Sequence, residues 1–138
     1  MKLKPPSFLK NPDLGLLLLR LGIGVLYIFH GVPKFMKGPE TWQWLGSQTT
    51  ALGNGLEFTY VPLGFIAALV ETLGGVFLIL GFFFRTSCLL LAFTMLVAFV
   101  SHFPIEEGYW LIEAGWPLEM GIVFTALLFI GPGRFTLR

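Results

Sequence analysis

The sequence predicts an all-α fold: a polytopic membrane protein with a four-transmembrane-helix bundle, folded as a single domain over residues 1–138. Its composition is 55% hydrophobic and only 12% charged, with a mean hydropathy of +0.79. Such a composition is too apolar for a soluble domain of this size. Four apolar stretches are also long enough to cross a hydrocarbon core of roughly 30 Å. We therefore expect four spans, at about residues 14–36, 62–84, 86–103 and 115–130.

The first span follows a short basic leader that contains Lys2, Lys4 and Lys10. A basic leader before an apolar run is also typical of a secretory signal peptide. Here Arg20 interrupts the run, which is too long for a signal peptide and is not followed by a small-x-small cleavage site. We interpret the run as a retained transmembrane helix.

The outer loop over residues 37–61 is long for a connection between two helices, and loops of that length are usually functional or locally structured. We expect residues 41–52 to form a short interfacial helix that acts as a lid, with Trp42 and Leu45 in the bilayer. Arg85 separates the second span from the third, and the turn sequence at residues 131–133 ends the fourth.

The basic residues indicate the orientation, because they are retained on the cytoplasmic side of a membrane. One side holds Lys2, Lys4, Lys10, Arg85, Arg134 and Arg138. The other side holds Lys37 together with five acidic residues, Glu40, Glu57, Glu106, Glu107 and Glu113. Both termini are therefore predicted to be cytoplasmic.

Ionisable side chains inside the apolar stretches are the main indication of function, because charge in hydrocarbon is costly and usually functional. These residues are Arg20, His30, Lys34, Glu71, His102 and Glu119. At 100° per residue, the three on the first span share one helix face with Tyr27. On the second span, Glu71 lies among small residues that recur every seven positions, Ala67, Gly74 and Gly81. Small residues let a neighbouring helix approach closely, so Glu71 is expected to face the bundle interior.

The helix rise places most of these residues at one level of the membrane. His30, Lys34, Glu71, His102 and Glu119 all fall in the outer half, where four helices would form one polar pocket. Arg20 falls nearer the cytoplasmic end. It is expected either to have a structural role or to face lipid, where it would pair with a phosphate.

Such a pocket suits proton-coupled oxidation or reduction of a quinone, whose carbonyl oxygens need hydrogen-bond donors and protons. Histidine exchanges protons near neutral pH, and a nearby lysine favours the anionic form of a buried carboxylate. We assign catalytic roles to His30, Glu71 and Lys34, and substrate-binding roles to Tyr27, His102, Glu119 and Trp116. The alternative for each histidine is a helix-end residue bonded to a carbonyl or to water.

Several other chemistries are not favoured. The single cysteine, Cys88, excludes an intramolecular disulfide and a CxxC redox pair. His30 and His102 would permit bis-histidine haem ligation, but no second histidine pair is present, so we expect no haem. No pair of residues on one helix has a spacing diagnostic of metal binding, so we expect no metal. The balanced net charge of +1 gives no reason to propose nucleic acid.

Four segments of the chain carry a combined pattern: RLGIGVLYIFHGVPK at residues 20–34, ETLGGVFLILGFFFR at 71–85, MLVAFVSH at 95–102 and GPGRFTL at 131–137. Together they resemble the DoxX family of small membrane proteins. The resemblance covers all four predicted spans in order. It implies a four-helix protein of the bacterial or archaeal inner membrane, related to the DoxD subunit of thiosulfate:quinone oxidoreductase.

We therefore expect an inner-membrane oxidoreductase, or a redox-complex subunit, that binds a quinone or a similar lipophilic molecule in the outer half of the bundle. Membrane lipid, a soluble redox partner and a second copy of the chain are the expected partners. Two alternatives stay open. One is a transporter of a small solute or protons. The other is a membrane scaffold or assembly subunit in which the ionisable residues only hold helices together.

Overall fold

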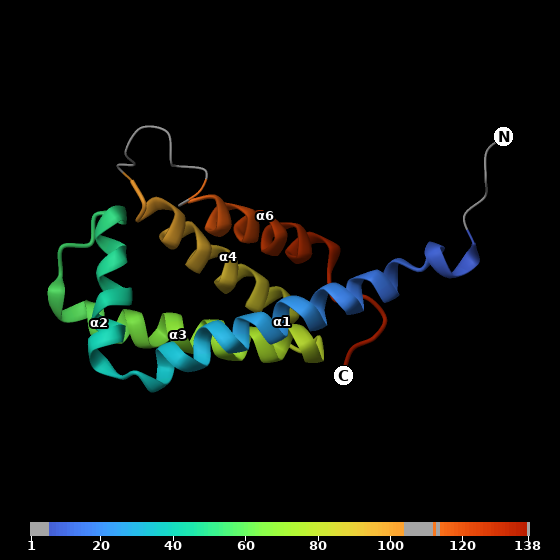
Figure 1. Ribbon diagram of the computed structural model, residues 1–138, viewed down its shortest axis with the longest axis horizontal. Helices are drawn as coiled ribbons and strands as arrows, with labels where there is room; N and C mark the ends of the chain where they lie inside the picture. Colours follow the sequence, from blue (N-terminus) through green and yellow to red (C-terminus); the bar gives the residue numbers. More distant parts are fainter. Residues whose placement is uncertain (1–5, 104–111, 113, 138) are drawn as a thin grey trace.

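The computed structural model describes residues 6–103, 112 and 114–137, and every regular element in these residues is helical. The predicted all-α fold is thus confirmed for this part of the chain (Figure 1). In order, the elements are η1 (Ser7–Lys10), α1 (Pro12–Met36), α2 (Pro39–Ser47), η2 (Gln48–Leu52), η3 (Glu57–Thr59), α3 (Tyr60–Leu80), α4 (Phe84–Val100) and α6 (Gly115–Ile130), where η denotes a 3₁₀ helix.

Helix α1 begins with two local signals. The side chain of Asn11 accepts a hydrogen bond from the Leu14 N–H at 3.1 Å, and Pro12 occupies the first helical position. The helix continues through Pro33 and ends at Met36, which is the predicted end. Its 25 residues give a length of about 37 Å, enough to cross a bilayer core.

Two helical segments are long and apolar enough to cross a membrane, Pro12–Met36 and Glu57–Leu80. Helices α4 and α6 are also apolar but have only 17 and 16 residues. Two membrane-crossing segments are therefore supported by length and composition. That α4 and α6 cross as well, to give four spans, stays a prediction.

The boundary between the second and third predicted spans needs correction. We expected the second span to reach residue 84, but α3 ends at Leu80 because Gly81 adopts a left-handed conformation with φ of +72°. Phe83 is also left-handed, with φ of 45°, and α4 then begins at Phe84. The sequence hides this turn because the residues around it are almost all apolar.

The helices pack as two pairs, α1 along α3 and α4 along α6, and α3 joins the pairs through its contact with α4 (Figure 1). Glycines let α1 and α3 approach backbone to backbone. A Cβ atom on Gly24 would lie 2.7 Å from the carbonyl oxygen of Gly75, and one on Gly75 would lie 2.6 Å from that of Gly24. Gly31 lies equally close to Thr72, where an added Cβ would be 2.6 Å from the backbone nitrogen.

Helix α2 covers the end of the bundle where α1 ends and α3 begins, which we call the α2 end (Figure 1). Gly46 packs against the backbone of Tyr60, and Gly64 packs against the backbone of Trp42. The expected helix over residues 41–52 is thus α2 followed by η2, starting two residues earlier than predicted.

We expected Trp42 to lie in the bilayer. In the structure its indole packs against the rings of Phe35 and Phe65, with centroids 6.1 and 5.0 Å away. Its ring N–H donates to the carbonyl oxygen of Lys34 at 3.1 Å. This hydrogen bond removes the only polar group of the indole from lipid and fixes α2 on the end of α1.

The apolar core lies between the two helix pairs, and its largest buried side chains include Tyr27, Leu78, Leu91, Met95 and Phe124. Many large apolar side chains point outward instead, such as Phe29 at 72% exposure and Phe129 at 76%. A surface this apolar suits hydrocarbon rather than water as the surrounding medium.

Candidate functional site

An ion pair joins α1 to α3 near the α2 end. The Nζ atom of Lys34 lies 2.9 and 2.7 Å from the two carboxylate oxygens of Glu71. The Glu71 side chain is only 4% exposed, whereas that of Lys34 is 28% exposed. The prediction that Glu71 faces the bundle interior is confirmed. The contact of Gly31 with Thr72 explains the reach of Lys34, because it brings the two backbones together one helical turn away.

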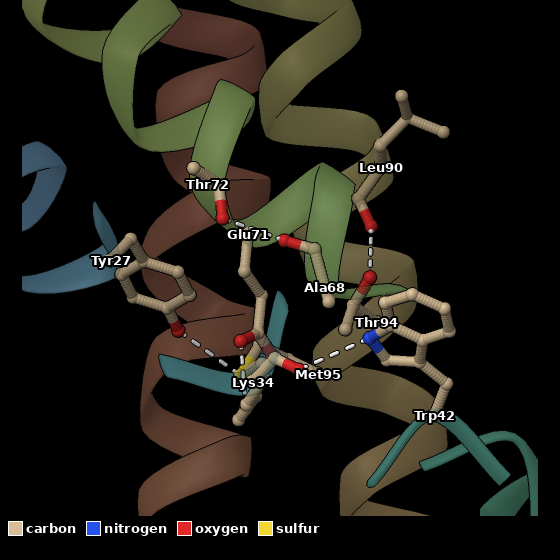
Figure 2. A network of polar contacts seen from close by, with 9 residues as sticks. All are labelled: Tyr27, Lys34, Trp42, Ala68, Glu71, Thr72, Leu90, Thr94 and Met95. Carbon is tan, nitrogen blue, oxygen red and sulfur yellow. Dashed lines mark hydrogen bonds and ion pairs between the residues drawn. The ribbon is translucent and has the colours of Figure 1, made fainter. Parts of the chain in front are cut away.

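Tyr27 is the third member of this polar centre. Its side chain is buried, and its hydroxyl donates a hydrogen bond to Sδ of Met95 at 3.1 Å. Figure 2 shows this hydroxyl on the side of the ring where the Lys34 ammonium and the Glu71 carboxylate meet. A thioether sulfur is a weak acceptor. The buried Tyr27 hydroxyl therefore makes only a weak hydrogen bond to Met95 on α4.

Two further predicted residues lie against the ring of Tyr27. The His30 ring meets it edge-on with centroids 6.0 Å apart, and the Trp116 ring stacks on it at 6.4 Å. His30 and Trp116 are themselves 5.2 Å apart, and both are exposed. On the inner side, Phe124 packs edge-on against Tyr27 at 4.9 Å. These rings connect α1 with α6.

His102 and Glu119 do not join this group in the part of the chain that the structure describes. Nδ1 of His102 lies 2.6 Å from the carbonyl oxygen of Ala98, one turn back in its own chain. This is the helix-end alternative stated for the histidine. Glu119 is exposed because α6 turns Pro117 and Phe124 inward, and residue 119 lies about 200° around the helix from Pro117.

The sequence left two roles open for Arg20, a structural one and a lipid-facing one. The structure supports the structural role. The side chain is 1% exposed and donates four hydrogen bonds to backbone carbonyls. Its acceptors are Leu78 and Ile79, each at 2.8 Å, Pro132 at 2.8 Å and Phe135 at 2.6 Å. Two of these carbonyls belong to the last turn of α3, where helical partners are missing.

The same end of the bundle holds residues 131–137, which we call the tail. The Leu137 N–H donates to the carbonyl oxygen of Leu80 at 2.9 Å, and the Arg134 N–H donates to Oδ1 of Asp13 at 3.0 Å. The sequence signalled a turn at residues 131–133 but not what the tail binds. Arg20 thus ties α1 to the end of α3 and to the tail.

A cavity lies between α4 and α6. It is an open groove of about 650 Å³ with mostly apolar walls. None of the predicted site residues lines this groove, so it differs from the polar pocket that we expected. Met95 belongs to both regions, since it lines the groove and accepts the Tyr27 hydrogen bond. Within the described residues, no three His, Cys, Asp or Glu side chains come together as metal ligands.

Comparison with known proteins shows which family has sequences similar to this chain. The sequence model of the DoxX family matches residues 15–103, which include most of α1 and all of α2, α3 and α4. The chain is 30% identical to the inner membrane protein YqjF of Escherichia coli over 129 residues, 93% of this chain and 92% of that protein. It is 28% identical to an uncharacterized protein of Haemophilus influenzae over 128 residues, 86% of this chain and 84% of that protein. No solved structure matches. The chain belongs to the DoxX family.

Proposed function

We propose that this protein is a membrane redox subunit that binds a lipid-soluble carbonyl compound of the quinone class beside Tyr27 and the Lys34–Glu71 pair. The observation that carries the proposal is the Tyr27 hydroxyl, which is buried and donates to a thioether sulfur 3.1 Å away. A carbonyl oxygen is a stronger acceptor than a thioether. A quinone oxygen placed beside this hydroxyl would therefore gain a better hydrogen bond than the one that it replaces.

The neighbouring side chains supply the remaining requirements. Reduction of a quinone to its hydroquinone consumes two electrons and two protons, and oxidation releases them. Glu71 and His30 are the proton-exchange groups in this proposal, and Lys34 stabilises negative charge next to Glu71. The electrons come from, or go to, a redox partner. The exposed His30 and Trp116 rings offer flat surfaces beside Tyr27.

The proposal also covers location and topology. The Escherichia coli relative is named as an inner membrane protein. We propose the same membrane here, with all four long helices crossing it and both termini in the cytoplasm. The α2 end would then face outward, and the end that Arg20 closes would face the cytoplasm.

The test is extraction of the protein, purified in mild detergent, with organic solvent, followed by mass spectrometry and a visible spectrum. Tyr27→Phe and Glu71→Gln are the test variants. Thr94→Val is the matched control, because Thr94 is only half-buried and its hydroxyl donates to a carbonyl of its own helix, that of Leu90 at 2.9 Å. We expect wild type and control to retain a quinone and both test variants to lose most of it. Equal retention in all four proteins would contradict the proposal.

A scaffold is the second candidate function, because an ion pair between α1 and α3 could serve only to hold them together. The two candidates differ in what Tyr27→Phe changes. A scaffold gives no reason for a ligand to be lost with one hydroxyl. The scaffold would be favoured if no quinone is extracted from any of the four proteins and the effects of Lys34 and Glu71 on the free energy of unfolding are strongly coupled.

A further inference from the structure

The groove between α4 and α6 has the character of a site for a hydrocarbon chain. Its volume of about 650 Å³ falls within the range of small-molecule sites. Phe93 and Phe129 line it and are 57% and 76% exposed, so it opens on the outer surface of the bundle. The hydroxyl of Thr125 already donates to the carbonyl oxygen of Gly121 at 2.7 Å. These walls therefore favour an apolar occupant.

Met95 connects this groove to the polar centre. Its side chain lines the groove, is 2% exposed, and accepts the Tyr27 hydroxyl on its sulfur. Across the groove floor, a Cβ atom on Gly121 would lie 3.6 Å from Cβ of Met95, so no larger side chain covers the methionine there. One flexible side chain thus separates the groove from the buried donor. Methionine has three rotatable bonds and adapts its shape readily.

We infer that the groove holds the hydrocarbon chain of the same lipid-soluble molecule whose polar head binds beside Tyr27, with Met95 as the movable wall between them. This inference rests on the proposed function and adds the class of ligand: an amphiphile with one long apolar chain. The chain would enter sideways from the membrane, because the α2 end is covered by α2 and the opposite end is closed by Arg20 and the tail.

The experiment compares two quinones that differ only in the chain, ubiquinone-0, which has none, and decylubiquinone. Quenching of tryptophan fluorescence gives both dissociation constants for the purified protein in detergent. We expect wild type to prefer decylubiquinone by about tenfold or more, which corresponds to burial of roughly two methylene groups. In Ala126→Phe, where the new ring fills the groove, the preference should fall to about twofold or less.

Two controls keep the outcome interpretable. Val25→Phe places the same ring at a 43% exposed site on α1, outside the groove, and should keep the wild-type preference. Because Ala126→Phe could disturb folding, a photoreactive benzoylphenylalanine at Phe93 provides a second measurement. It should crosslink to a decylubiquinone added before illumination.

The outcomes separate this inference from the proposed function. Binding of both quinones with an equal preference in wild type and Ala126→Phe would overturn the groove assignment and leave the head site standing. Crosslinking of Phe93 to a second copy of the chain, with no quinone adduct, would assign the groove to an oligomer interface and also overturn it. Binding of neither quinone would overturn both proposals.

Discussion

The two halves of helix α1 each hold a cation, Arg20 in the first and Lys34 in the second, and the two cations bind different kinds of partner. Arg20 is fully buried, and its acceptors among the described residues are four backbone carbonyls. Lys34 is partly exposed and binds a carboxylate, Glu71. A planar guanidinium with five donors can satisfy several carbonyls at once, whereas an ammonium is a compact point charge suited to one anion. The difference teaches that a cation within an apolar helix can bind either the backbone of its neighbours, as Arg20 does, or a single buried anion, as Lys34 does.

The largest loss of stability should follow removal of the Arg20 guanidinium. Arg20→Met leaves four carbonyls without their donor and detaches the tail from α1 and α3. We expect a loss of about 3–5 kcal/mol in the free energy of unfolding. Thermal unfolding monitored by size-exclusion chromatography in detergent measures it.

Arg20→Lys sharpens the same comparison. Lysine keeps the charge but cannot reproduce the fork of donors, so it should restore only a small part of the lost stability. A fully stable Arg20→Lys variant would mean that the charge, rather than the geometry of the four hydrogen bonds, holds this end together.

The ion pair should give an intermediate effect that depends on which partner is removed. Lys34→Met leaves a buried carboxylate unpaired, and we expect it to cost about 2–4 kcal/mol. Glu71→Leu leaves a lysine whose side chain is already 28% exposed, and it should cost roughly 1 kcal/mol. The double variant should be more stable than Lys34→Met alone.

A double-mutant cycle on unfolding free energies measures this coupling, which we expect at about 1–3 kcal/mol. Thr94→Val paired with Lys34→Met serves as the uncoupled control. If the effects of Lys34→Met and Glu71→Leu on the free energy of unfolding simply add, the two side chains do not stabilise each other. Lys34 could then not be contrasted with Arg20 as a cation that binds one anion.

Tyr27→Phe should have the smallest effect on stability, less than about 1 kcal/mol, because the hydrogen bond that it removes ends on a weak sulfur acceptor. The ring contacts with His30, Trp116 and Phe124 would remain. Unfolding in detergent compares this variant with wild type. A loss as large as that of Lys34→Met would show that the hydroxyl serves the fold rather than a ligand.

Much of the fold could be predicted because the pattern along a helix specifies which face is buried. Glu71 was placed inward from the small residues around it, and α1 ends at the residue predicted. The pocket was harder to predict. His102 and Glu119 share a predicted depth with the site, but depth does not specify the direction of a side chain. His102 bonds to a carbonyl of its own chain, and Glu119 points outward from α6.

The sequence by itself determined the helical class, the apolar segments and the face of α1 that carries Tyr27, His30 and Lys34, because these follow from composition and from 3.6 residues per turn. Tertiary structure decided the partners. The acceptors of Arg20 lie 58 to 115 residues away in the chain, and Met95 lies 68 residues from Tyr27. Such pairs depend on how closely two helices approach each other and on where along their lengths they meet. Those distances are set by packing across the bundle, which no local pattern records.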